Sequence, residues 1–440
     1  MPNLTPAQAL VFGFAALIFA GGILLSLPIS SATDKPVPFL DALFTATSAV
    51  CVTGLVVVDT GTRYSIFGQV VIMLLIQMGG LGIMTMTTLL ALLLGKRINL
   101  RERLRIQEGL NQYSMAGVVS LTRTVLLMSV LFEGAGALLL ALRFVPEFGL
   151  GKGLYFSLFH AVSAFNNAGL DLMGDFQSLT RYVTDPLVSL TIAGLIISGG
   201  LGFTVILGIN RRRRFSRLSF HAKLVLIITA VLLVTGTLVI LMLEYGNNAT
   251  IGRLNFGGKL LASFFQSVTP RTAGFNTVDI GKMRGATLFF MIMLMFIGAS
   301  PASTGGGIKT TTAGVLLLAV WSMVRGKHDV EALHRRIPGE IILRALTVAV
   351  LAMLLLVGVT MLLSITEPFE FLKILFEATS AFGTVGLSMG ITPSLSVWGK
   401  ILIMLLMYSG RVGPMTVAVA VANRQKVAPV RYPEEKVVVG

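Results

Sequence analysis

Four short glycine-ended segments could together replace the water shell of a cation. They are Val52-Thr53-Gly54, Asn167-Ala168-Gly169, Thr272-Ala273-Gly274 and Thr384-Val385-Gly386. Rings of backbone carbonyl oxygens can bind a dehydrated cation, and glycine permits the backbone angles that such a loop needs. The segments recur about every 110 residues, which indicates four copies of one unit. The chemistry to expect is cation binding at these carbonyls.

A short apolar stretch precedes each segment. These stretches are too short to cross a bilayer, which takes roughly 20 residues in a helix. A half-length helix that ends in extended, glycine-containing backbone is typical of a re-entrant pore loop, because irregular backbone at membrane depth must line water or be buried in protein. Each glycine alone could simply end a helix, but the fourfold recurrence favours pore loops. The half-helices are expected at residues 39–49, 154–165, 259–268 and 372–382.

The composition is that of an integral membrane protein. Hydrophobic residues make up 54% of the chain, charged residues 12%, and the mean hydropathy is +0.84. No soluble domain of any size is expected, and residues 7–27 form an anchor helix rather than a signal peptide. The single cysteine, Cys51, excludes an internal disulfide and a cysteine-built metal site.

We therefore predict an all-α membrane protein of four span–pore-loop–span repeats, with eight transmembrane helices and four re-entrant half-helices in pseudo-fourfold arrangement around one pore. The spans are expected at residues 7–27, 67–95, 118–144, 187–209, 222–245, 287–324, 340–363 and 397–421. Only the span at 287–324 is expected to be interrupted. The repeat units are residues 1–105, 106–217, 218–336 and 337–423, followed by a cytoplasmic tail, 424–440.

The charges indicate the orientation in the cell membrane. The connections between units are rich in basic residues, and the loops within units hold most of the acids, which predicts that both termini are cytoplasmic. Acids at an outer mouth would raise the local cation concentration. The run Arg211–Arg214 is interpreted as a topology determinant or a contact to anionic membrane lipid, not as a nucleic-acid site. The basic connections include Lys96, Arg97, Arg101, Arg103, Arg105, Arg211, Arg212, Arg213, Arg214, Arg217, Arg325, Arg335 and Arg336.

A second repeated element lies in the second span of each unit, at Gly79-Gly80-Leu81-Gly82 and Gly199-Gly200-Leu201-Gly202. Its third copy, residues 298–309, contains a proline and a glycine triplet and cannot be a continuous helix. We interpret it as a polar gate below the filter that faces the pore. It fails the pattern of a phosphate-binding loop, because Ile308 stands where glycine should precede lysine. The gate residues are Ala302, Ser303, Thr304, Gly305, Gly306, Gly307, Lys309 and Arg411.

Three charges fall within predicted spans. Arg411 could hold the gate by donating to its carbonyls, since guanidinium has five donors, or it could reach the inner interface. Lys309 is expected to pair or to turn toward the cytoplasm, because in the path it would repel cations. Glu133 has no evident partner. Intramembrane charges are functional candidates by default.

Together these features resemble the superfamily of K⁺ transporters that contains Trk, Ktr and plant HKT proteins. The resemblance rests on the four loops closing at Gly54, Gly169, Gly274 and Gly386, the break at 298–309, and the Ser-Gly-Arg-Val-Gly stretch at 409–413. The chain begins directly with the first unit, without the two additional spans of Trk subunits, and so is most similar to the Ktr membrane subunit, KtrB.

The resemblance implies passive, gated K⁺ uptake, stimulated by Na⁺ in some members. It also implies a homodimer with one pore per protomer and a cytosolic KtrA-like ring that binds ATP or ADP. In the HKT branch a serine at the first filter glycine accompanies Na⁺ selectivity, so Gly54 favours K⁺. The loops lack most of the K⁺-channel Thr-Val-Gly-Tyr-Gly signature, and we expect weaker rejection of Na⁺ than in a tetrameric channel.

Three other interpretations remain. The same fold could pass Na⁺ or a mixture of monovalent cations. An intramembrane enzyme is disfavoured, because the four histidines form no ligand motif and the serines at 300 and 303 have no evident base. A carrier with inverted repeats is disfavoured because each unit has an even number of spans and the same charge pattern.

Overall fold

The computed structural model describes residues 6–33, 35–82, 118–212, 214–327, 329–414 and 416. Four long helices open the four units, and these four are apolar and long enough to cross a membrane among the described residues. They are α1 (Pro6–Ser26), α7 (Val118–Phe148), α11 (Phe220–Glu244) and α15 (Gly339–Thr366). Each agrees with an expected span. The basic residues between 96 and 105, Arg213 and the tail at 424–440 lie outside the described residues.

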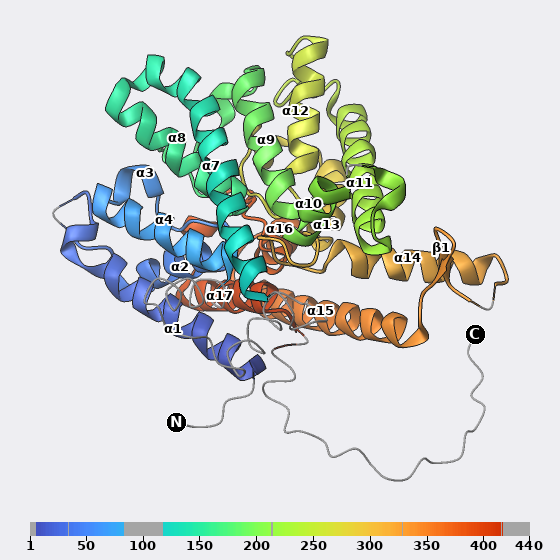
Figure 1. Ribbon diagram of the computed structural model, residues 1–440. Helices are drawn as coiled ribbons and strands as arrows, with labels where there is room; N and C mark the ends of the chain where they lie inside the picture. The colour runs from blue at the N-terminus through green and yellow to red at the C-terminus, as the bar shows by residue number, and fades with distance from the viewer. Residues whose placement is uncertain are drawn as a thin grey trace.

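A short helix follows each long one and packs against it (Figure 1). The four lie within four residues of the expected half-helices and have their buried faces toward the interior of the bundle. They are α2 (Phe39–Val50), α8 (Leu150–Phe165), α12 (Phe256–Val268) and α16 (Phe371–Gly383). All are shorter than a bilayer is thick.

Within the described residues the second long segment is broken in units 2 and 3, which corrects the expectation that only the third would be interrupted. The helices are α4 (Ile66–Leu81), α9 (Pro186–Leu201), α13 (Gly285–Phe296) and α17 (Val397–Val412). Three of them end at a glycine with positive φ: Gly82 at +84°, Gly202 at +91° and Gly413 at +94°. Since this conformation suits glycine and is incompatible with a right-handed helix, each of these three helices ends there.

The predicted continuous span at 187–209 is therefore wrong. After Gly202 the chain continues as α10 (Phe203–Arg212), whose axis is bent 96° from that of α9. In the third unit α13 is followed by irregular backbone and then α14 (Thr310–Val324). The spans predicted at 67–95 and 397–421 extend into residues outside the described ranges.

Smaller elements connect the helices. A two-stranded hairpin, β1 (Glu331–Ala332) with β2 (Arg335–Arg336), joins α14 to α15 and is a minor addition to the expected all-α fold. The rest are α3 (Thr60–Arg63) and the 3₁₀ turns η1 (Pro28–Ser30), η2 (Thr180–Tyr182), η3 (Phe215–Arg217), η4 (Ile280–Lys282) and η5 (Thr392–Ser394).

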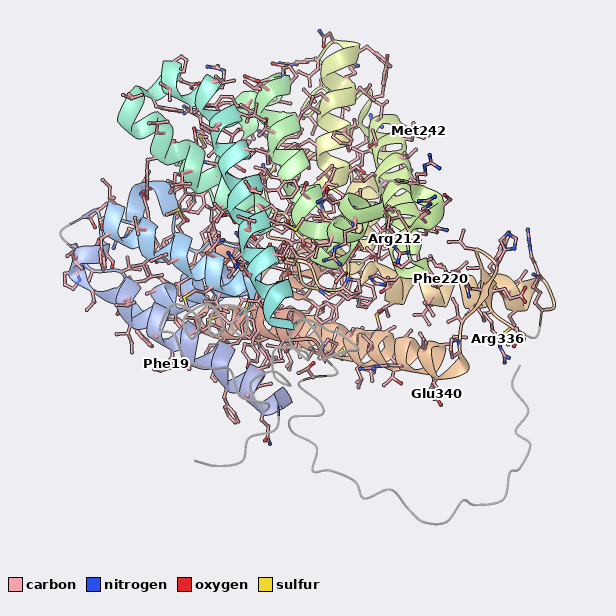
Figure 2. All side chains as sticks on the ribbon, in the orientation of Figure 1. Phe19, Arg212, Phe220, Met242, Arg336 and Glu340 are labelled. Carbon is pink, nitrogen blue, oxygen red and sulfur yellow. The ribbon has the colours of Figure 1, made fainter. Side chains whose placement is uncertain are left out.

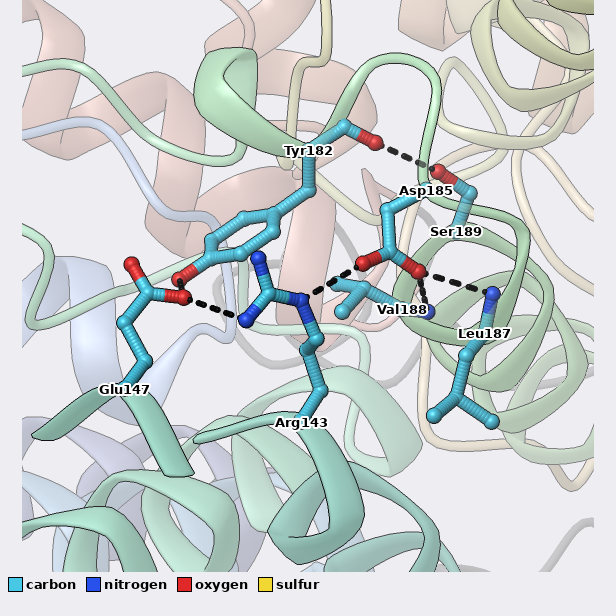
Figure 3. A network of polar contacts seen from close by, with 7 residues as sticks. All are labelled: Arg143, Glu147, Tyr182, Asp185, Leu187, Val188 and Ser189. Atoms are coloured by element: carbon cyan, nitrogen blue, oxygen red, sulfur yellow. Dashed lines mark hydrogen bonds and ion pairs between the residues drawn. The ribbon is translucent and has the colours of Figure 1, made fainter. Parts of the chain in front are cut away.

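Polar contacts tie the end of the first helix to the start of the second in three units. In unit 2, Asp185 caps α9 by accepting from the N–H groups of residues 187 and 188, and Arg143 Nε donates to Asp185 at 2.9 Å (Figure 3). Arg143 also pairs with Glu147 at 3.0 Å, which accepts from the Tyr182 hydroxyl. In units 3 and 4, Glu244 and Glu367 accept from the N-terminal backbone of α13 and α17.

The outer surface of the bundle is apolar. Phe19 on α1 and Met242 on α11 are 56% and 77% exposed and point away from the helices (Figure 2). Arg212 lies near Phe220, at the end of α11 opposite Met242. A broad apolar exterior with charge at one end of the helices is the distribution that a lipid environment requires.

Candidate functional site

The four glycine-ended segments share an unusual backbone conformation. In each, the residue two places before the glycine has positive φ: Val52 at 50°, Asn167 at 58°, Thr272 at 69° and Thr384 at 49°. The closing glycines have φ between 68° and 94°. A left-handed conformation is costly for β-branched residues such as Val52, and backbone strain of this kind concentrates at functional sites.

The four segments meet in a closed ring. A Cβ atom built on Gly54 would contact the carbonyl oxygen of Ala168. One on Gly169 would meet that of Ala273, and one on Gly274 that of Val385. The ring closes in the same sense, from Gly386 back to Thr53, and each built Cβ would lie within 2.7 Å of its oxygen. The structure thus brings all twelve predicted filter residues together, and no side chain fits where the glycines stand.

Hydroxyl groups on the short helices hold the ring from behind. The hydroxyls of Ser48 and Ser380 accept from the N–H of Gly54 at 3.0 Å and of Gly386 at 3.1 Å. Ser163 Oγ donates instead to the carbonyl of Leu170 at 2.7 Å. Sequence reasoning missed these residues. The available signal was a serine six positions before the glycine in three of the four copies.

The predicted gate residues lie directly below the ring, as part of an irregular segment, residues 297–309. Its N–H groups at Ser300 and Thr304 donate to the carbonyls of Gly200 and Gly199 at the end of α9, and Gly307 N–H donates to Gly410 on α17. The last carbonyls of a helix have no partner within it. The segment therefore supplies the bonds that these broken helices lack.

The expectation that the polar side chains of this segment all face the pore needs correction. Thr304 is fully buried, and its hydroxyl donates to the carbonyl of Phe165 at 3.1 Å. Ser303 Oγ donates back to the carbonyl of Ser300. Thr384 Oγ1 accepts from the N–H of Gly306 at 3.1 Å and so joins the segment to the ring. These hydroxyl groups form hydrogen bonds that hold the segment in place.

Arg411 joins two elements across the site. Its guanidinium donates to the carbonyl of Thr304 and to the carbonyls of Gly79 and Gly80, the last at 3.0 Å. Gly79 and Gly80 lie at the C-terminal end of α4, where the helix dipole favours a cation. Arg411 therefore holds the irregular segment against α4 rather than reaching the inner interface.

Lys309 folds back onto its own segment. Its Nζ donates to the carbonyl of Gly305 at 2.8 Å. The side chain is half-buried, and this bond holds the ammonium group at the Gly305 carbonyl. Lys309 thus lies paired, as expected for a cation that must not obstruct a pathway.

One acid follows the second segment of the ring closely in the sequence. Asp171 follows Gly169 by two residues and accepts from the N–H of Met173 at 2.9 Å. Burial, together with the nearby Asp59 carboxylate, raises the pKa of the Asp171 carboxyl to about 7. Asp171 therefore changes charge near neutral pH.

Known proteins similar to this chain are cation transport proteins. The sequence model of the TrkH family, described as a cation transport protein, matches residues 12–428. The Ktr system potassium uptake protein B of Bacillus subtilis is 49% identical, covering 99% of this chain and 97% of its own. The potassium/sodium uptake protein NtpJ of Enterococcus hirae is 44% identical over 100% of this chain and 98% of its own.

Solved structures give the same fold. The potassium transporter TrkH of Vibrio parahaemolyticus superposes with a TM-score of 0.77 over 96% of this chain and 86% of that one. Sequence identity in this superposition is 17%. The likeness therefore supports the architecture.

Proposed function

The chain belongs to the TrkH family of cation transport proteins, and from this premise we propose that it is the membrane subunit of a potassium uptake system. The ring of residues 52–54, 167–169, 272–274 and 384–386 is the selectivity filter, at the centre of four span–pore-loop–span repeats. The observation that carries the proposal is the closed succession of glycines and neighbouring carbonyls. The chain is a transporter and not an enzyme.

The short helices support cation binding electrostatically. α2, α8, α12 and α16 all end within a few residues of the ring, so their C-terminal carbonyls point their negative dipole ends toward it. A cation that sheds water there meets carbonyl dipoles instead. Four half-helices aimed at one point stabilise K⁺ without placing a full negative charge in the path.

Residues 302–307, with Lys309 and Arg411, form the gate in this proposal. The segment occupies the space below the ring and is held by Arg411 and by the ends of α9 and α17. Displacing it would free helix-terminal carbonyls, which is tolerable only where water reaches them. Opening would therefore coincide with hydration of the inner pore.

The proposed assembly follows the relatives. The name of the Bacillus subtilis protein places it in a Ktr system, and we propose that this chain likewise acts with a regulatory subunit, a cytosolic KtrA-like ring that binds ATP or ADP. We also propose a homodimer in the cell membrane, contacts to membrane lipid, and both termini in the cytoplasm. Na⁺ permeation is the second candidate, because the Enterococcus relative is named a potassium/sodium uptake protein.

The test is growth rescue of a K⁺-uptake-deficient bacterium at low K⁺, combined with K⁺ and Na⁺ fluxes of the purified protein in liposomes. Wild type should rescue growth, and deleting residues 302–306 should increase K⁺ flux several-fold. Deleting residues 331–335, an exposed hairpin of the same length, should leave flux unchanged. Failure to rescue even with a ring subunit supplied, together with a Na⁺ current, would favour the Na⁺ alternative.

A further inference from the structure

The residue three places before each closing glycine lies behind the ring and differs among the four segments. These residues are Cys51, Asn166, Arg271 and Gly383. The two long polar side chains reach the first helix of their own unit: Asn166 contacts α7 and Arg271 contacts α11. The ring is thus backed by chemically different groups on neighbouring sides.

Arg271 backs the third segment with an unpaired positive charge. The side chain is 5% exposed, and one terminal nitrogen donates to Thr229 Oγ1 at 3.3 Å. Its Nε has no hydrogen-bond partner. Among the described residues no carboxylate forms an ion pair with it. A guanidinium in this position keeps its charge, because arginine is not deprotonated in proteins.

Glu133 backs the second segment through Asn166. The residue is 7% exposed, and its Oε1 accepts from Gln77 Nε2 at 2.9 Å and from Asn166 Nδ2 at 3.1 Å. Gln77 Oε1 in turn accepts from Asn166 at 2.8 Å. Both partners are side-chain amides, and in the described part of the chain no basic group pairs with Glu133. These two amide donors hold the Glu133 carboxyl group in place behind the second segment.

In the described part of the chain neither Arg271 nor Glu133 has an oppositely charged partner, so each acts on the ring. Moving a charge from water to membrane depth is costly. When such a charge has no counter-ion, no opposite charge weakens its electrostatic effect on a nearby bound cation. A filter must bind a cation firmly enough to admit it and weakly enough to release it. Opposite charges behind adjacent segments adjust that balance without touching the ion.

We propose that Arg271 and Glu133 set the cation affinity of the ring from behind and in opposite directions. Arg271 weakens binding beside the third segment, and Glu133 strengthens it beside the second. This inference rests on the proposed function, because it requires the ring to bind K⁺. Both are positioning residues that do not themselves bind the ion.

The experiment is calorimetric titration of K⁺ into the purified full-length protein. A unit charge about 10 Å away, at an effective dielectric constant of about 20, changes a dissociation constant roughly tenfold. Arg271→Gln should therefore lower the K⁺ dissociation constant roughly tenfold, and Glu133→Gln should raise it. The double variant should lie close to wild type.

Two controls separate charge from structure. Arg271→Lys keeps the charge and should bind K⁺ within about threefold of wild type. Thr229→Val removes the hydrogen bond of Arg271 and keeps its charge, so it should also leave K⁺ binding unchanged. Loss of packing alone would weaken binding in every variant and could not produce opposite shifts.

The outcomes are distinct. Shifts of equal sign for Arg271→Gln and Glu133→Gln, or no shift in either, overturn the inference. If Arg271→Gln does not fold, Glu133→Gln alone decides: weaker K⁺ binding supports the inference and unchanged binding overturns it. If wild type binds no K⁺ and carries no K⁺ flux, the proposed function itself fails.

Discussion

At the scale of single residues, the ring depends on the absence of Cβ atoms. Gly54 has φ +94°, and a Cβ there would lie 2.6 Å from the backbone oxygen of Ala168, which cannot turn aside as a side chain could. Gly54→Ser should therefore widen the ring and reduce the K⁺/Na⁺ permeability ratio by roughly tenfold, about the effect of 1.4 kcal/mol. Reversal potentials in mixed K⁺ and Na⁺ measure it.

Gly149→Ala is the matched control for that change. Gly149 has φ +82° but no atom within 4 Å of a built Cβ. It carries the same backbone penalty, on the order of 1–2 kcal/mol, without a clash in the ring. Equal losses of selectivity in both variants would show that backbone strain, and not the ring, is responsible.

Asp171 provides a pH-dependent contribution at the same scale. With a pKa raised to about 7, its carboxyl is charged at pH 8 and neutral at pH 6. A carboxylate beside the ring concentrates cations, so K⁺ uptake at low K⁺ should fall as the pH is lowered through 7. Asp171→Asn should abolish that fall in liposome flux measurements, and Asp175→Asn, at an exposed position, should retain it.

Ionisation of Asp171 should lower the stability of the fold, although it should increase K⁺ uptake. Folding raises the pKa of Asp171 from 3.8 to about 7, so the folded protein binds the proton more tightly and its stability falls as the pH rises between these two values. Asp171→Asn should therefore increase the melting temperature more at pH 8 than at pH 5. An equal change at both values would contradict the assigned pKa.

At the scale of elements, buried acids join the first helix of a unit to the second. Glu244, fully buried at the end of α11, accepts from the Arg284 N–H at 2.9 Å and from the hydroxyls of Thr287 and Thr250 at 2.5 and 2.7 Å. Glu244→Ala leaves these donors unsatisfied and should cost about 2–3 kcal/mol. Thermal unfolding in detergent measures the loss. Glu340→Ala, at an exposed position, should change stability little, and a similar effect of both would argue against the fastening role.

The same scale shows what sequence could and could not predict. The short helices and the ring segments were predictable, because a motif repeated four times stands out from chance glycine pairs. The break at Gly202 was not, since hydropathy continues smoothly through 187–209 and a helix packed through small residues has the same composition. The contacts of Arg271 and Glu133 were also out of reach, because hydrogen bonds between distant helices leave no local pattern.

At the scale of the whole molecule, the last unit must meet the first for the ring to close. The contact between the last and the first unit, here called the seam, contains an ion pair between Lys400 on α17 and Asp41 on α2. The two charged atoms are 2.6 Å apart, and the side chains are 16% and 18% exposed. Tyr408 on α17 also donates to the carbonyl of Val11 on α1 at 2.6 Å. Since Gly386 contacts Thr53 across the same seam, loosening it should disturb the ring.

Lys400→Met should therefore lower both the melting temperature and the K⁺/Na⁺ permeability ratio, because it leaves Asp41 largely buried without a counter-charge. The stability loss should be about 1–3 kcal/mol, between the values for exposed and fully buried pairs. Lys282→Met breaks the pair with Asp279, whose side chains are 62% and 50% exposed. It should change neither the melting temperature nor the permeability ratio. The exchange Asp41→Lys with Lys400→Asp should recover part of both properties. If stability falls while selectivity stays unchanged, the seam only holds the fold, and the filter keeps its geometry independently of the closure between the first and last units.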